Sequence, residues 1–269
     1  MKDLIIVRGG GDLATGTIYK LRQMGFPVLV LEVAAPSAIR RTVSFSEAVY
    51  QGQQTVAGMT CHRASSLEEA ATLVEQGQLA ILVDPAADAI ARLKPLAVVD
   101  AILAKKNLGT HKTMAPITVA LGPGFLAGVD VDAVVETQRG QDLGKVICQG
   151  SAAANTGIPG IVGGYGKERV IYSPAEGILQ GIRQIGDRVK RGEAIARVRT
   201  DEEEVPVYAT LDGMIRGLIR DGYPVTQGFK IADIDPREES DCFAISDKSL
   251  RIADGVLEAV LTLKGERGL

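Results

Sequence analysis

Short apolar runs alternate with helical patterns in the first half of the chain. The strand-like runs cover residues 4–7, 28–31, 79–83, 96–99 and 117–121. Between them, apolar residues recur at helical spacing over residues 13–21, 67–75 and 86–93. Strands that are apolar throughout and alternate with helices are typical of a parallel sheet covered on both faces. The pattern therefore predicts an α/β domain, which loosens into glycine-rich connections up to Gly164.

A glycine-rich stretch, RGGGDLATG at residues 8–16, follows the first predicted strand. Gly9, Gly11 and Ala14 match the pattern G-x-G-x-x-A between a strand and a helix. Glu32 ends the second predicted strand 21 residues after Gly11, where dinucleotide sites carry a ribose-binding acid. The context predicts a Rossmann-like domain with a ligand at this loop.

Asp12 argues against a simple dinucleotide site. The amides of Gly9, Gly10 and Gly11 would face a phosphate group, and the Asp12 carboxylate would repel that anion while capping the helix itself. Arg8 partly offsets this charge. A tight, capped turn without a ligand therefore stays open as the alternative.

Polar residues follow the predicted strands, where ligands collect in open α/β sheets. Adjacent Arg40 and Arg41 have the forked donors that clamp a phosphate, although a solvated pair is the alternative. The candidate ligand-binding residues are Arg8, Gly9, Gly10, Gly11, Asp12, Glu32, Arg40, Arg41, Asp100, Gly122, Gly124 and Arg139.

Catalytic and metal-binding patterns are weak in this sequence. The chain has two histidines, and no Ser-His-Asp or Cys-His arrangement identifies a general acid or base. Its three cysteines, Cys61, Cys148 and Cys242, are widely spaced without a CxxC pair, which favours buried reduced thiols over a metal site.

The second half contains an internal repeat. The segment VIYSPAEGILQGIRQIGDRVKRGEAIARV is echoed by PVYATLDGMIRGLIRDGYPVTQGFKIADI with a constant offset of 36 residues. Glycines at equal steps place turns and bulges at equivalent positions. The repeat predicts two similar hairpin units that pack face to face around a pseudo-two-fold axis.

This repeat resembles the barrel-sandwich fold of biotinyl and lipoyl domains, in which Gly186, Asp187, Val189 and Gly192 match a familiar turn. Such domains carry their modified lysine at the junction of the two halves. Here the junction, residues 199–204, reads RTDEEE and has no lysine. We therefore expect no lipoyl or biotinyl group.

Together these patterns predict three regions. Residues 1–165 form a Rossmann-like domain with a mostly parallel sheet, residues 166–236 a small β barrel-sandwich domain, and residues 237–269 a helical tail that packs back on the first domain. Whether the tail also makes a homodimer contact is left open.

The composition restricts the classes of partner that the protein is expected to bind. The chain of 269 residues is 46% hydrophobic and 23% charged, with a net charge of −3, so it lacks the basic excess of nucleic-acid-binding proteins. It has no apolar run long enough to span a bilayer and no signal-peptide layout. We expect a cytoplasmic protein that binds neither nucleic acid nor membrane.

Several long strings are recognisable together. They are RGGGDLATGTIYKL, AIRRTVSFSEAVYQG, VVDAILAKKNLGT, APITVALGPGFLAGVDVDAVVETQRGQDLG, NTGIPG and DGMIRGLIRDGYPVTQGFKIADIDPR. With them the chain resembles the YqeB family of selenium-dependent molybdenum hydroxylase systems, nearly end to end. The resemblance implies an accessory or maturation factor with hydroxylase apoprotein and maturation factors as partners. The first half is also distantly similar to XdhC-type chaperones, which bind molybdenum cofactor. One departure is Gln141, where the family pattern ETxRGH has histidine.

Three functions stay open from the sequence. The first is an accessory protein that binds a phosphorylated pterin, as in molybdenum cofactor, or a nucleotide at the strand ends. The second is an NAD(P)-dependent oxidoreductase, for which Glu32 favours NAD. The third is a scaffold for hydroxylase assembly in which the glycines are only structural.

Overall fold

A computed structural model of the chain describes residues 1–238 and 241–269. Their contacts divide them into two compact units. The first contains Met1–Pro36, Ser44–Asn155 and Ile245–Leu269, and the second contains Ser37–Val43 and Thr156–Ala244. Residues 37–43 and 156–165 thus belong to the second unit, whereas the division expected from the sequence placed both in the first.

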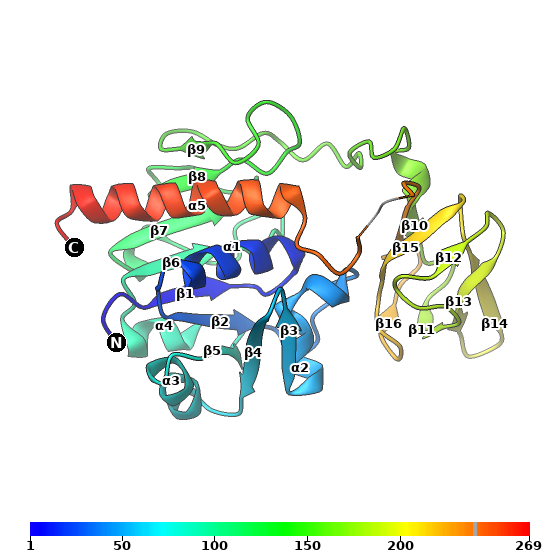
Figure 1. Ribbon diagram of the computed structural model, residues 1–269, viewed down its shortest axis with the longest axis horizontal. Coiled ribbons are helices and arrows are strands. Elements are labelled where there is room, and N and C mark those ends of the chain that lie inside the picture. The colour runs from blue at the N-terminus through cyan, green and yellow to red at the C-terminus, as the bar shows by residue number, and fades with distance from the viewer. Residues whose placement is uncertain (239–240) are drawn as a thin grey trace. The chain divides into compact units, whose positions relative to one another are not determined.

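The first unit is built around a nine-stranded, mostly parallel sheet (Figure 1). Across the sheet the strands are β3 (Gln53–Val56), β4 (Met59–Ala64), β5 (Leu79–Val83), β2 (Val28–Glu32), β1 (Ile5–Arg8), β6 (Ala97–Asp100), β7 (Ile117–Leu121), β8 (Ala133–Val135) and β9 (Val146–Ile147). The outermost pairs, β3–β4 and β8–β9, are antiparallel, and the pairs between them are parallel. The predicted parallel sheet is confirmed, because its central strands are apolar on both faces.

Helices cover both faces of this sheet. The helices are α1 (Asp12–Gln23), α2 (Ala48–Gln51), α3 (Leu67–Glu75), α4 (Asp88–Leu93) and α5 (Asp247–Glu266), with 3-10 turns at Arg41–Val43, Phe45–Glu47, Lys112–Met114 and Lys167–Arg169. Leu4, just before β1, and Ile6 of β1 pack in one cluster with residues of α3 and α4. Because strand side chains alternate, Ile5 and Val7 face the opposite side, where α1 and α5 lie together (Figure 1).

The C-terminal helix α5 runs alongside α1. Ser246 caps its first turn by accepting from the Ser249 amide, and the Ser249 hydroxyl donates to the carbonyls of Asp12 and Leu13. One turn or more further along, Lys20 of α1 pairs with Asp254 of α5 at 2.7 Å. The two helices therefore begin at the same edge of the sheet, the edge where its parallel strands end (Figure 1).

The far end of α5 is held by a buried carboxylate, Asp132. Arg267 donates to Asp132 Oδ1 at 2.8 Å, and the side chain of Asp132 is 2% exposed. Burial by itself raises the pKa of Asp132, but hydrogen bonds from Arg267 and Thr118 outweigh it and hold the pKa below its usual value. This carboxylate stabilises the fold when it is charged.

We expect Arg267→Gln to lower the free energy of unfolding by about 1 kcal/mol at neutral pH. A carboxyl whose pKa is depressed in the folded state stabilises above its unfolded pKa of about 3.9, and that contribution is lost as pH falls through the folded pKa. Urea unfolding at pH 7 and pH 3 should therefore show the difference from wild type shrinking at the lower pH. Arg92→Gln, which breaks the exposed pair with Glu68, is the control and should change little.

The second unit consists of two four-stranded antiparallel sheets. One has the order β10 (Val170–Tyr172), β17 (Lys230–Asp235), β15 (Gly213–Leu218), β12 (Arg188–Val189), and the other β14 (Glu204–Tyr208), β13 (Ala194–Arg199), β11 (Gly177–Gly181), β16 (Pro224–Val225). Together they form a barrel sandwich, and the described strands do not close into a barrel.

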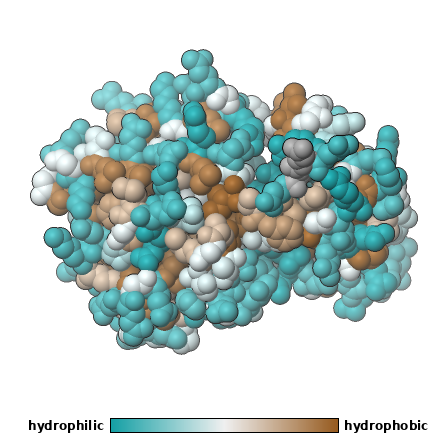
Figure 2. Space-filling view, viewed as in Figure 1, coloured by the Kyte–Doolittle hydropathy of each residue, from teal (hydrophilic) through white to brown (hydrophobic). Residues whose placement is uncertain are grey.

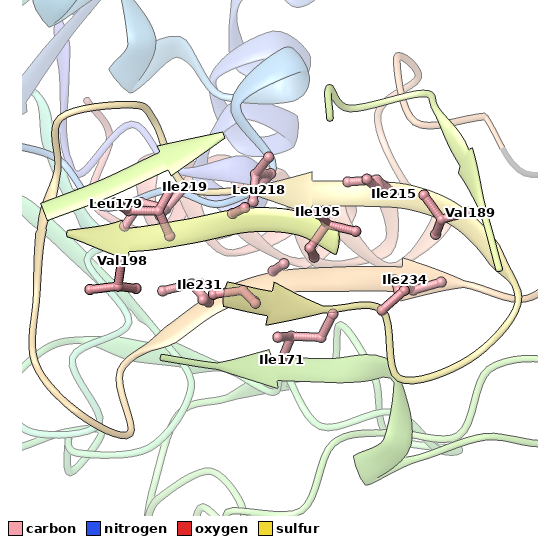
Figure 3. Close-up of a cluster of buried hydrophobic side chains, with 14 of the residues drawn as sticks. Ile171, Leu179, Val189, Ile195, Val198, Ile215, Leu218, Ile219, Ile231 and Ile234 are labelled. Carbon is pink, nitrogen blue, oxygen red and sulfur yellow. The ribbon is translucent and has the colours of Figure 1, made fainter. Parts of the chain in front are cut away.

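The repeat in the sequence maps strand onto strand. β11, β12 and β13 begin 36 residues before β15, β16 and β17 respectively. The two copies exchange partners, since β11 pairs with β16 and β12 pairs with β15. Their inner faces share one apolar core, which includes Leu179, Ile195, Ile215 and Ile231 (Figure 3). The two halves are thus interleaved and complete each other's sheets.

The surface is mostly polar, with smaller apolar areas, on the face that Figure 2 shows. None of the helices in the described part of the chain combines the length and the apolar character that crossing a bilayer requires. The free cysteines differ in exposure: Cys61 and Cys242 are buried as expected, but Cys148 is exposed, so the expectation of a buried thiol is wrong there.

Candidate functional site

The strand ends of the first unit meet at a topological switch point between β1 and β6. From β1 the chain passes through α1 to β2 on one side, and from β6 it continues to β7 on the other. Arg8 and Asp100, the last residues of β1 and β6, are partners in register. The structure therefore brings together Arg8, the glycine loop, Glu32 and Asp100, at the place where α/β sheets bind ligands.

Arg8 and Asp100 are joined through a threonine. The Thr110 hydroxyl accepts from the Arg8 guanidinium and donates to Asp100 Oδ2, while the direct distance from Arg8 to that oxygen is 3.7 Å. Both charged side chains are buried, at 6% and 2% exposure. Burial raises the pKa of Asp100, and the hydrogen bonds from Thr110 and Ile102 and the charge of Arg8 oppose this. The Arg8 guanidinium is thus part of a hydrogen-bond network inside the protein.

The loop after β6, residues 101–111, lies over these strand ends. Asn107 holds it by accepting from the amides of Gly109 and Thr110, each at 2.8 Å, and by donating to the Thr110 carbonyl. No helix is present between residues 101 and 111. The loop is an ordered cover over β1 and β6.

Close packing against neighbouring segments explains three of the candidate glycines. A Cβ on Gly9 would lie 3.0 Å from the Ala101 carbonyl oxygen, and one on Gly124 would lie 2.7 Å from the Lys106 backbone. A Cβ on Gly122 would lie 2.6 Å from the Thr137 hydroxyl oxygen. Each of the three also has a positive φ, which side chains rarely adopt. These glycines make room for neighbouring protein segments.

Glu32 also binds within the protein. Its Oε2 accepts from the Gly10 amide and its Oε1 from the Val33 amide, both at 2.8 Å. Burial raises the pKa of Glu32, and these two hydrogen bonds lower it in part. The Gly10 amide, which was expected to face a phosphate, therefore meets a carboxylate of the chain itself.

Gly11 is the open position of the loop. It is the N-cap of α1, with φ −65°, and no side chain caps the helix there. A Cβ on Gly11 would meet nothing within 4 Å. Asp12 is the first residue of the helix, so the expectation that Asp12 caps it is wrong. The first amides of α1 consequently lack the side-chain partner that an N-cap residue normally supplies.

Arg139 lies beside the start of α5, since its guanidinium is 3.5 Å from Asp247 Oδ2. It belongs to an exposed turn after β8 that also carries Gln141. Glu136, just before this turn, is buried and accepts from the amides of Thr137, Gln138 and Ala153, each at 2.7 Å. Glu136 was not among the candidate residues, although an acid directly after an apolar run was a usable signal.

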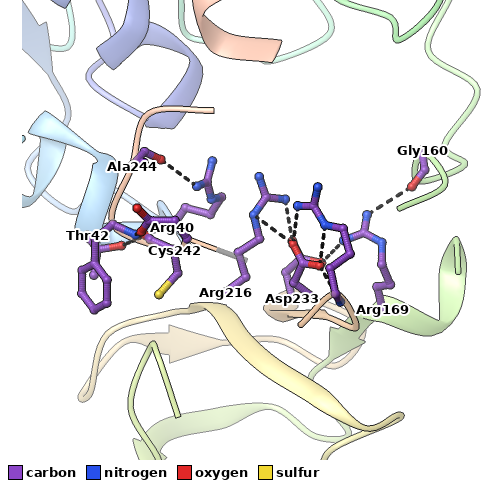
Figure 4. Close-up of polar contacts among 12 residues, drawn as sticks. Arg40, Thr42, Gly160, Arg169, Arg216, Asp233, Cys242 and Ala244 are labelled. Atoms are coloured by element: carbon purple, nitrogen blue, oxygen red, sulfur yellow. Dashed lines mark hydrogen bonds and ion pairs between the residues drawn. The ribbon is translucent and has the colours of Figure 1, made fainter. Parts of the chain in front are cut away.

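Arg40 and Arg41 belong to the second unit. Arg41 Nε donates to the Leu218 carbonyl at 2.7 Å, and Arg40 donates to the Ala244 carbonyl at 3.4 Å (Figure 4). The two neighbours therefore point to different backbone oxygens, and the glycine loop lies in the other unit.

Metal ligands are not assembled in the described residues, which contain no group of three or more His, Cys, Asp or Glu side chains placed to hold an ion.

The fold and the strand-end site define a two-unit protein, in which a mixed α/β unit with a large, mostly parallel sheet is joined to a barrel-sandwich unit. The family described as "RND related, barrel-sandwich hybrid domain" matches residues 168–258. Over 261 residues, 97% of this chain and 48% of the relative, the chain is 50% identical to "Uncharacterized protein YqeB" of Escherichia coli strain K12. This match supports the resemblance to the YqeB family. The chain spans about half the length of this curated relative.

Solved structures also show similarity at low identity. The product-bound ectoine utilization protein EutE (DoeB) from Ruegeria pomeroyi is 14% identical, with 86% of this chain and 57% of that chain covered and a TM-score of 0.25. An aspartoacylase family protein from Mesorhizobium loti MAFF303099 is 13% identical, with 88% and 86% covered and a TM-score of 0.32. At these values neither similarity supports a conclusion about function.

Proposed function

We propose that this chain is an accessory protein for selenium-dependent molybdenum hydroxylases that binds a phosphorylated ligand, a molybdopterin or a nucleotide, at the N-terminus of α1. The observation that carries the binding site is Gly11, where the helix starts without a side-chain cap and with open space around it. Helix N-termini favour anions because their amides point outward and the helix dipole is positive there. The link to molybdenum hydroxylases and selenium rests on the family resemblance.

The residues at the strand ends fit the phosphate end of such a ligand. The start of α5, also at this edge, and the half-exposed Arg139 add further positive potential beside α1, although Asp12 and Asp247 reduce it. The described residues contain no cluster of metal ligands. We therefore propose that this chain contacts only the phosphate end of the ligand. Molybdenum cofactor, when bound, supplies the redox chemistry of the hydroxylase that receives it.

A nicotinamide enzyme has less support. The Glu32 carboxylate accepts from two backbone amides, including that of Gly10, and is therefore partly taken up by the protein where a ribose would need it. A scaffold role in which the glycines are only structural agrees with the packing of Gly9, Gly122 and Gly124. Gly11 distinguishes a ligand-binding role from a purely structural role of the glycines, because no packing requires a glycine at that position.

Replacing Gly11 tests the site without disturbing the fold. The position has an ordinary φ and free space, so Gly11→Asp and Gly11→Asn should both fold, and both side chains should cap α1 and raise its stability. Only the aspartate adds a negative charge at the helix N-terminus. We expect Gly11→Asp to weaken binding of molybdenum cofactor or CTP at least tenfold relative to Gly11→Asn in calorimetric titrations. Equal affinities of the two variants would contradict the proposed site.

A further inference from the structure

The second unit contains a cavity of about 680 Å³. It lies beside the sheet in which β14, β13, β11 and β16 are neighbours (Figure 1). Its wall includes residues 200–203, the turn between β13 and β14, which belongs to the junction where carrier domains have their modified lysine. Sites for small molecules usually have volumes of about 300–1,000 Å³, so this cavity has room for a ligand.

The lining of the cavity is acidic. It contains four carboxylates, from Glu176, Asp201, Glu202 and Glu203, and one guanidinium, from Arg199, which leaves a formal charge of −3. The net charge of the whole chain is also −3, so the excess of negative charge is gathered at this cavity. Within the described part of the chain, none of the four carboxylates takes part in a hydrogen bond or an ion pair. The cavity therefore favours a cation.

The internal repeat provides a second copy of this part of the unit for comparison. β11 pairs with β16 so that Gly177 lies opposite Val225, and β15 pairs with β12 so that Gly213 lies opposite Val189. Gly213 and Val225 follow Gly177 and Val189 by the same offset of 36 residues. Because the two strand pairs have the same register, their neighbouring positions can be compared residue by residue.

One of these two copies has an ion pair that the other lacks. One position beyond the compared residues, Asp212 pairs with Lys190 at 3.0 Å. The equivalent residues of the other copy are Glu176 and Thr226, and both line the cavity. Threonine has no charge, so Glu176 lacks the cation that its counterpart has. The repeat thus shows, independently of the acidic lining, that an ammonium group fits beside this carboxylate position.

We propose that this cavity binds an organic cation with several alkylammonium groups, of the polyamine type. One ammonium would lie beside Glu176, as the Lys190 ammonium lies beside Asp212, and the others would lie beside the carboxylates of the turn between β13 and β14. The apolar part of the wall, which includes Val205 and Val225, would contact the carbon chain.

The spread of the carboxylates agrees with such a ligand. Among the described residues, no group of three or more His, Cys, Asp or Glu side chains converges closely enough to hold a metal ion. Carboxylates that lie apart from one another match a cation whose charges are also separated along a chain. This site is in the second unit and goes beyond the function proposed for the first.

The first test is calorimetric titration of the full chain with spermidine at low, constant ionic strength. We expect saturable binding that Glu176→Gln weakens about fivefold, because the variant loses one charge contact at an exposed position. Glu193→Gln is the matched control: it makes the same change in net charge at an exposed carboxylate of the second unit, one that pairs with Arg183 at 3.8 Å. It should bind spermidine like the wild type.

The second test adds the missing lysine. In Thr226→Lys the new ammonium should pair with Glu176 and occupy the cavity, so spermidine binding should weaken about tenfold. Thr226→Gln has a long side chain without charge and should bind like the wild type. Thr226 is exposed, so both variants should fold, and their unfolding midpoints without ligand check this.

Titration with an acetylated trilysine amide distinguishes two sources of the ligand. Tighter binding of spermidine would support a free polyamine, and tighter binding of the peptide would assign the same cavity to lysine side chains of a partner. Saturable binding of neither compound would overturn the proposal, as would equal spermidine affinities of Glu176→Gln and Glu193→Gln. Neither compound carries a phosphate, so these results do not depend on the site at Gly11.

Discussion

Arg8→Met is expected to destabilise the first unit by about 3–5 kcal/mol, because it leaves the Asp100 carboxylate buried without its cation. The remaining hydrogen bonds from Thr110 and Ile102 cannot replace that charge. Urea unfolding followed by circular dichroism at pH 8 gives the free energy of unfolding.

The loss should depend on pH in a defined direction. Burial already raises the pKa of Asp100, and removing Arg8 raises it further. A group with a raised folded pKa favours the native state at low pH and loses that contribution as pH rises through the folded pKa. The defect of Arg8→Met should therefore be smaller at pH 5 than at pH 8.

The double variant Arg8→Met, Asp100→Asn is the control for this network. It removes both charges, so it should recover most of the stability that the single variant loses. A single variant with the same defect at both pH values, or a double variant that is no more stable, would show that the pair contributes little. Because Thr110 bridges the pair, the same measurements report on the loop of residues 101–111.

Gly255→Ala is expected to destabilise the protein by about 1–3 kcal/mol through overpacking. In an ordinary helix interior this change stabilises, since alanine has the higher helix propensity. Here a Cβ on Gly255 of α5 would overlap the Gly144 carbonyl oxygen and would lie 3.0 Å from Val135. The close packing of α5 against Gly144 and Val135 thus reverses the sign of the effect.

Gly265→Ala provides the comparison within the same helix. A Cβ there would meet nothing within 4 Å, so we expect a gain of about 0.5 kcal/mol. The two variants can be compared by thermal unfolding under identical conditions. Stabilisation by both would mean that α5 does not pack against Gly144 as the structure has it.

Elements that depend on local pattern were predictable. The apolar runs that became β1, β2, β5, β6 and β7 needed only the alternation of strand and helix periods, because continuous burial leaves a continuous apolar signal. The short hairpin β3–β4 was missed, since its exposed edge strand, QQTV, carries no apolar run. The two-residue strands β9, β12 and β16 are defined by the strands with which they pair more than by their own composition.

In the candidate site, too, the sequence predicted some features and the folded structure decided others. Gly9, Gly10 and Gly11 form one motif in the sequence, yet the structure separates them: Gly9 packs against Ala101, the Gly10 amide binds Glu32, and Gly11 alone is open. Similarly, adjacent Arg40 and Arg41 are directed to carbonyls far along the chain. A motif shows only which residues are neighbours in the sequence, whereas hydrogen-bond partners depend on which groups lie close together in the folded structure.

The sequence by itself determined the α/β order of the first unit and the 36-residue repeat of the second, because period and glycine spacing act over a few neighbours. Only the tertiary structure decided that the two repeats exchange strands and that Glu32 binds the Gly10 amide. It also decided that four distant arginines gather around Asp233 and Asp235. The reason is physical: buried charges and amides must find partners wherever the folded chain places them, and sequence separation does not limit that choice.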